Sequence, residues 1–172
     1  MFNLKEKIKE LASYKFLACK AGRQGISWQS FVKDSKLMLT DLNTGDLAEV
    51  LIMWMLGYFQ RFDKNLSVHS NPRLDMEGVD ILLKRFGQEF PIQIKFNKNN
   101  DRYYGGEITV VEVGPPATFL GHIYTRKENG NAVLFSILSE CGAYSEEELY
   151  DLFEKDDTFE ETIRKAWEWL KN

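Results

Sequence analysis

Apolar residues along the chain recur at two spacings, one helical and one typical of strands. Residues 3–18 place apolar side chains three or four positions apart with Lys and Glu between them, which predicts an amphipathic helix. The segment TGDLAEVLIMWMLGYFQRF, residues 44–62, has the apolar density of a helix that is buried on most sides. We expect Asp46 to be its N-cap, with Glu49 three residues later completing a capping box.

A strand pattern follows in the segment EGVDILLKRFGQEFPIQIKFN, residues 77–97. GVDILLKRF and FPIQIKFN flank the connection GQE, in which Gly87 can adopt a positive φ, so a β-hairpin is expected. Residues 65–78 are predicted to be a loop or an edge strand, because Pro72 cannot donate to a central ladder. The segment GEITVVEVG, residues 106–114, is a further strand candidate.

The remaining segments have weaker patterns. Residues 25–43 show no regular period, and residues 117–138 are ambiguous between a hairpin turning at Asn129-Gly130 and a short helix, with strands slightly favoured. Two helices are expected to close the chain, each opened by a capping box. The boxes pair Ser145 with Glu148 and Thr158 with Glu161.

Together these elements predict an α/β fold with a mixed central β-sheet flanked by helices, an N-terminal helix and two C-terminal helices. The 172 residues fit a single domain, 1–172, with a substantial core. No apolar run is long enough to span a bilayer, and the first residues lack the apolar centre of a signal peptide. A soluble cytoplasmic protein is therefore expected.

Charge is unevenly distributed along the chain. Residues 1–40 hold eight Lys or Arg against three acids, whereas residues 138–172 hold four against eleven. A polyanion would bind to the amino-terminal third and the middle of the chain, because the acidic segment 138–172 would repel phosphate. An unevenly charged but inert surface fits the same counts. Cys19 and Cys141 match no metal-ligand spacing and are expected to be structural thiols.

The predicted hairpin carries polar side chains on one face. Successive strand residues point to opposite faces, so Ile92, Ile94 and Phe96 share one face, whereas the other carries Asp80, Gln93 and Lys95. An unpaired buried charge costs several kcal/mol. These groups must therefore be exposed, paired with one another or gathered around a ligand.

A strand with GVD, a turn and a strand with QIK resemble the PD-(D/E)XK nuclease superfamily. Asp80 matches the Asp of that motif, Gln93 stands where the second acid is usual, and Lys95 matches the Lys. An acidic residue on a preceding helix often joins this cluster, and Glu49 is the candidate here. The resemblance covers residues 45–97 and implies a restriction-endonuclease-like fold with Glu49, Asp80, Gln93 and Lys95 as catalytic residues.

The resemblance also implies cofactors and partners. Hard Mg²⁺ or Mn²⁺ prefers carboxylate and carbonyl oxygens, which Glu49, Asp80, the Gln93 amide and the Ile94 carbonyl would supply. Lys95 would orient a water molecule or stabilise charge on the phosphate. Nucleic acid, DNA rather than RNA, is the expected partner, and a homodimer or a protein partner is compatible with it. Independently of the resemblance, Lys98, Arg102, Tyr103 and Tyr104 would suit contacts to bases and phosphates, and a flexible tyrosine-bearing loop without such contacts fits the same residues.

Other interpretations of the same residues stay open. Asp80 and Lys95 would also suit an exposed cross-strand ion pair, which contributes about 0 to 1 kcal/mol. Glu49 would then serve only the cap begun by Asp46. In a further alternative the chain is an inactive immunity or inhibitor-type subunit, which binds a basic partner through the acidic segment 138–172.

Overall fold

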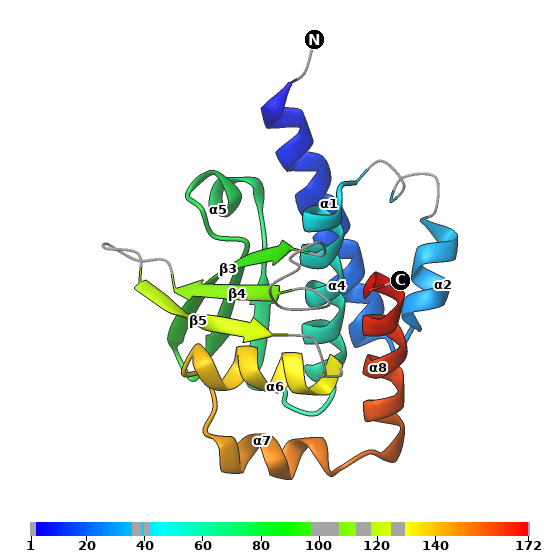
Figure 1. Cartoon of the computed structure of the whole chain (residues 1–172), viewed down its shortest axis with the longest axis vertical. Coiled ribbons are helices and arrows are strands. Elements are labelled where there is room, and N and C mark those ends of the chain that lie inside the picture. The colour runs from blue at the N-terminus through cyan, green and yellow to red at the C-terminus, as the bar shows by residue number, and fades with distance from the viewer. Residues whose placement is uncertain are drawn as a thin grey trace.

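The computed structural model describes residues 3–35, 39, 42–97, 107–112, 118–124 and 130–171. Helices and strands both contribute to one arrangement around a β-sheet (Figure 1). The helices are α1 (Leu4–Arg23), α2 (Trp28–Asp34), α4 (Thr44–Phe59), α5 (Pro72–Met76), α6 (Gly130–Glu140), α7 (Glu146–Phe153) and α8 (Asp157–Lys171). The strands are β1 (Leu66–His69), β2 (Ile81–Arg85), β3 (Gln88–Asn97), β4 (Glu107–Glu112) and β5 (Thr118–Tyr124). Residues 25–43, which show no clear pattern in the sequence, thus include the helix α2.

The five strands lie in the order β1-β2-β3-β4-β5, each beside its neighbour in sequence. Every described pair is antiparallel, so the expectation of a mixed sheet is wrong for this part of the chain. The strands run as a meander, in which each strand lies beside the next one along the chain and runs in the opposite direction. The broader prediction, an α/β protein with a sheet flanked by helices, is confirmed.

The predicted hairpin is formed by β2 and β3, with Ile81 paired to Ile92. Its connection is shorter than the expected GQE, because Gln88 already pairs with Arg85. Only two residues make the turn, Phe86 with φ 50° and Gly87 with φ 76°. Two consecutive positive φ values are typical of a type I′ turn, whose twist suits an antiparallel hairpin.

Helix α4 forms the centre of the core. It contacts β1 and β3 of the sheet as well as α1, α6 and α8, and Figure 1 shows it between the sheet and α8. Because neighbours surround it, all ten residues of the run 50–59 are buried. The sequence prediction of a helix buried on most sides is confirmed.

Helices α1 and α4 cross at very close range through two glycines. A Cβ on Gly57 would overlap the backbone of Cys19, and a Cβ on Gly22 would overlap the Trp54 carbonyl and the Tyr58 amide. Only glycine permits this approach, which brings the backbones of the two helices into contact. The crossing determines how the buried face of α1 lies on α4.

The carboxy-terminal helices only partly follow the sequence patterns. The capping box of Ser145 and Glu148 is present at the start of α7. Helix α8, however, begins at Asp157, and the Asp156 carboxylate accepts the amide of Thr158, so a box opened by Thr158 is wrong. Residues 118–124 form a strand as favoured, whereas a hairpin at Asn129-Gly130 is wrong because α6 begins at Gly130.

Two further findings concern the whole described chain. Cys19 and Cys141 are both buried thiols outside any disulfide, as the prediction of structural thiols requires. Among the described helices, none combines the length and the apolar character that crossing a membrane would need.

Candidate metal centre

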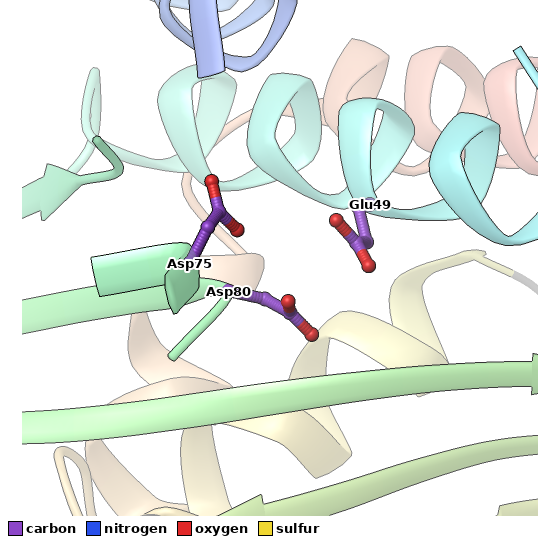
Figure 2. Close-up of side chains that lie close together, drawn as sticks. All are labelled: Glu49, Asp75 and Asp80. Atoms are coloured by element: carbon purple, nitrogen blue, oxygen red, sulfur yellow. The ribbon is translucent and has the colours of Figure 1, made fainter. Parts of the chain in front are cut away.

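Three carboxylates from separate elements meet beside the sheet. Glu49 lies on α4, Asp75 near the end of α5, and Asp80 in the bend immediately before β2. One oxygen from each lies within 4.8 Å of the others. Figure 2 shows the three side chains pointing into the space between α4 and the hairpin. We call Glu49, Asp75 and Asp80 the acidic cluster.

The chain before β2 is shaped to hold two of these acids. Helix α5 begins at Pro72, and the Asn71 side chain accepts the amide of Leu74, which caps the helix. Gly78 then adopts φ 84°, which lets the chain turn from α5 towards the sheet. Asp75 and Asp80 therefore lie on either side of one tight turn.

Asp80 is anchored to the Lys-bearing strand. Its amide donates to the Ile92 carbonyl at 3.0 Å, and its Oδ2 accepts the Ile94 amide at 2.7 Å. Asp80 was expected on the strand itself, but it lies one residue before β2. Its carboxylate bonds to the main chain of β3, which fixes its direction towards α4.

A lysine lies inside the acidic cluster. The side chain of Lys15, on α1, is 0% exposed, and its Nζ lies 2.8 Å from Glu49 Oε2 and 2.8 Å from Asp75 Oδ1. The same Nζ donates to the Asp80 carbonyl at 3.3 Å. Lys15 thereby joins α1, α4 and the turn before β2 through one ammonium group.

Burial is the main influence on the electrostatics of the cluster. Burial, together with the nearby charges of Asp80 and Asp46, raises the pKa of Glu49 to about 7 despite the opposing effect of Lys15. Burial likewise raises the pKa of Asp75 and of Asp80. One ammonium therefore does not compensate all the negative charge at this position.

Lys15 itself is held in its charged form. Burial alone would lower the pKa of its ammonium, but Glu49 and Asp75 raise the pKa by more. The interaction between these groups thus stabilises the charged lysine within the protein.

The predicted role of Asp46 and Glu49 at the helix start is wrong. Asn43 is the N-cap of α4, and its side chain accepts the amide of Asp46 at 2.8 Å. Asp46 is therefore in the first turn, where an acid suits the helix dipole. Glu49 is free of the cap and turns towards Lys15 instead.

Alternation along β3 is as predicted. Ile92 and Ile94 are buried, whereas Gln93 is half-buried and Lys95 is exposed. The described ion pairs do not include one between Lys95 and Asp80, but the positive charge of Lys95 lowers the pKa of Asp80 against the larger effect of burial. Lys95 is thus close enough to act electrostatically on the cluster while it remains open to solvent.

The expected nucleic-acid contacts Lys98, Arg102, Tyr103 and Tyr104 lie outside the described residues. The side chain of Ile94 is buried, and its amide is the donor to Asp80. Its carbonyl was the expected metal ligand, and that role stays a prediction.

Sequence reasoning missed two members of the site, Lys15 and Asp75. Lys15 interrupts the apolar stripe of α1, since it lies between the buried Ala12 and the buried Ala18 and Cys19. A lysine at a buried helical position requires a partner, and this was the available signal. Asp75 carries no comparable signal, because α5 is a five-residue helix with no buried residue of its own.

The residues of the cluster fit a divalent cation. The Asp75 side chain is only 8% exposed, and its Oδ2 is buried without a hydrogen-bond partner among the described residues. Such an orphaned carboxylate oxygen costs free energy unless a cation or a proton reaches it. Carboxylate oxygens are also the donors that Mg²⁺ and Mn²⁺ prefer. The acidic cluster could therefore hold a metal ion.

A surface cleft borders this site at Asp75. It encloses about 880 Å³ between the first turns of α1 and the end of α5, and its lining includes Lys5, Glu6, Asp75 and Met76. Asp75 thus belongs both to the acidic cluster and to the wall of the cleft.

Comparison with protein-family models, with curated proteins and with solved structures gives no match to this chain. The interpretation of the site therefore depends on its own geometry.

Proposed function

We propose that the chain is a divalent-cation-dependent nuclease of the PD-(D/E)XK type, which hydrolyses phosphodiester bonds, with DNA favoured over RNA. The observation that carries this proposal is the meeting of Glu49, Asp75 and Asp80 within 4.8 Å. The strand that anchors Asp80 also carries Gln93 and Lys95. Along the sequence, the chain carries an acid on a helix, then an acid before one strand, and then QxK on the next strand. The family resemblance implies the same order.

The proposed roles follow from exposure and charge. Glu49, Asp80 and the newly found Asp75 would hold Mg²⁺ or Mn²⁺, and the Gln93 amide and the Ile94 carbonyl are further candidate ligands. When bound, the metal would polarise the scissile phosphate and lower the pKa of a water molecule. Lys95 is exposed and affects Asp80 electrostatically, so its ammonium is suited to hold the attacking water or to stabilise charge on the phosphate.

Gln93 changes the charge balance of this site relative to the usual motif. An amide there removes one negative charge, and Asp75 supplies one from α5. The charge of Asp75 thus replaces the charge that is missing at Gln93, which supports a cation site although the motif lacks its second acid.

A cleavage assay tests the proposed activity. Plasmid DNA, single-stranded DNA and RNA are incubated with the purified protein in Mg²⁺ or Mn²⁺, and parallel reactions contain a chelator. We expect cleavage only with metal, and a loss of at least about a hundredfold in Asp80→Asn and Lys95→Ala. Lys64→Ala is the matched control, because Lys64 is an exposed lysine in the turn before β1. Cleavage by all variants alike, or by none with any substrate, would refute the proposal.

A second candidate function is binding without catalysis. It is favoured by the exposed face of α7, where Glu146, Glu147, Asp151 and Glu154 all face solvent. An inactive immunity or inhibitor-type subunit would use this face to bind a basic protein. A basic partner retained by the wild type, and lost on Glu147→Lys with Asp151→Lys, would support this function. Equal retention by both proteins would exclude α7 as the binding face.

A further inference from the structure

The ammonium of Lys15 lies among the carboxylates of the acidic cluster and supplies a permanent positive charge there. Its ammonium donates hydrogen bonds to Asp75 Oδ1 at 2.8 Å and to the Asp80 carbonyl at 3.3 Å, and it forms an ion pair with Glu49 Oε2 at 2.8 Å. None of the side chain is exposed. A lysine so placed is part of the site and does not act as a surface counter-charge.

Lys15 contacts some of the carboxylate oxygens of the cluster and leaves others without contact to its ammonium. The ammonium faces Oε2 of Glu49 and Oδ1 of Asp75, and the Ile94 amide takes Oδ2 of Asp80. Oδ2 of Asp75 and Oε2 of Glu49 are both buried without a hydrogen-bond partner among the described residues, although the Glu49 oxygen lies 2.8 Å from the ammonium. The lysine thus uses one side of the cluster and leaves oxygen donors on the other side for a ligand.

The charges of these groups limit what that ligand can be. When all three carboxylates are ionised to bind a cation, they and the ammonium carry a net charge of two negatives, which a single divalent cation balances. A second divalent cation would leave two uncompensated positive charges in a largely buried space, next to an ammonium that repels it.

We propose that Lys15 is a positioning residue that occupies the second cation position of the acidic cluster, so that the site binds one divalent cation and no more. The inference rests on the proposed function for the identity of the cation, but it concerns only binding. Under this inference α1 takes part in the metal centre, although it lies outside the PD-(D/E)XK pattern of residues 45–97.

The test measures Mn²⁺ binding without nucleic acid. Equilibrium dialysis with detection by electron paramagnetic resonance gives both the stoichiometry and the dissociation constant. We expect one Mn²⁺ per wild-type chain. In Lys15→Met the affinity should rise by at least about tenfold, or a second Mn²⁺ should bind, because the repelling charge is gone. Lys20→Met, an exposed lysine on the same helix, should bind Mn²⁺ like the wild type.

A charge-balanced variant keeps the test valid if Lys15→Met folds poorly without metal. Lys15→Met with Asp75→Asn restores the net charge of the wild-type cluster, so one Mn²⁺ should bind. The melting temperature of Lys15→Met should also rise more on addition of Mn²⁺ than that of the wild type. This readout reports cation binding and is independent of cleavage.

The outcomes separate this inference from the proposed nuclease function. Two Mn²⁺ per wild-type chain, no Mn²⁺ binding by the wild type, or unchanged affinity and stoichiometry in Lys15→Met would each overturn it. A wild type that binds one Mn²⁺ but cleaves nothing would contradict the nuclease and leave the inference standing. A wild type that cleaves DNA with two bound Mn²⁺ would support the nuclease and overturn the inference about Lys15.

Discussion

The carboxylate of Asp63 accepts a hydrogen bond from the hydroxyl of Tyr144, a residue 81 positions further along the chain. Asp63 follows α4, and Tyr144 precedes α7. The same carboxylate oxygen accepts Nε of Arg85 from the end of β2 at 3.0 Å, and the guanidinium lies over the Tyr144 ring. These contacts tie the central helix, the sheet and the carboxy-terminal helices together, away from the acidic cluster.

Loss of the Asp63 carboxylate should therefore destabilise the fold. Its side chain is 6% exposed, so Asp63→Asn leaves Arg85 without its buried partner and weakens the bond from Tyr144. We expect the free energy of unfolding to fall by about 3 kcal/mol in urea denaturation. Glu148→Gln is the control, because Glu148 pairs with the same Arg85 but is 46% exposed, and it should change the value by less than about 1 kcal/mol. Equal effects of the two variants would contradict this assignment.

Asp63 should also contribute to acid sensitivity. Burial alone would raise its pKa, but hydrogen bonds from Tyr144, the Asn65 amide and Arg85 hold the pKa below its ordinary 3.8. The unfolded chain then binds the proton more readily than the native protein does. The contribution of Asp63 is complete above pH 3.8 and is lost as the pH falls through its lower native pKa. The slope of unfolding free energy against pH in this acid range should be smaller in Asp63→Asn, and an unchanged slope would refute the prediction.

Glu49 should have the opposite pH dependence. Its native pKa is raised from 4.5 to about 7, so the native protein holds a proton that the unfolded chain has released. Stability should therefore fall as the pH rises from 4.5 to 7, by up to about 3 kcal/mol. Glu49→Gln should remove most of this decline, measured by urea denaturation across that range without divalent cations. Glu147→Gln, an exposed acid on α7, should leave the decline intact, and a decline in Glu49→Gln equal to the wild type's would count against the raised pKa.

The glycine crossing of α1 and α4 should tolerate no side chain. In Gly57→Ala the new Cβ would overlap the Cys19 backbone, and backbone atoms cannot move aside as a side chain end can. We expect a loss of about 3 kcal/mol or more in unfolding free energy. Gly45→Ala in the same helix meets only the Asn43 side chain, at 3.3 Å, so its effect should stay within about 1 kcal/mol. Thermal and urea unfolding of both variants measure the difference, and a Gly57→Ala as stable as Gly45→Ala would disprove the close crossing.

Much of the secondary structure could be predicted from local patterns. The helix of residues 44–59 and the hairpin of β2 and β3 follow from apolar spacing and a turn glycine, and the capping box at Ser145 is also local. The failures are local as well. The sequence pattern favours Asp46 as the cap, whereas Asn43 caps α4, and it favours a turn at Gly130, where a helix begins. Several residue types suit such positions about equally well, so short signals of this kind do not choose between neighbours.

The acidic cluster was predictable only in part, for a physical reason. Strand alternation and the QIK motif point to Asp80, Gln93 and Lys95 because these residues are neighbours on one hairpin, where the spacing of the chain determines the geometry. Asp75 and Lys15 reach the same place from a short helix and from a helix 60 residues earlier in the sequence.

By itself the sequence determined the helix of residues 44–59 and the hairpin of β2 and β3, and that polar groups share one face of this hairpin. The tertiary structure decided that Lys15 enters the cluster, because α1 crosses α4 at two glycines and carries the lysine to Glu49. No local pattern contains that crossing, since it depends on two backbones that meet only when the core is packed.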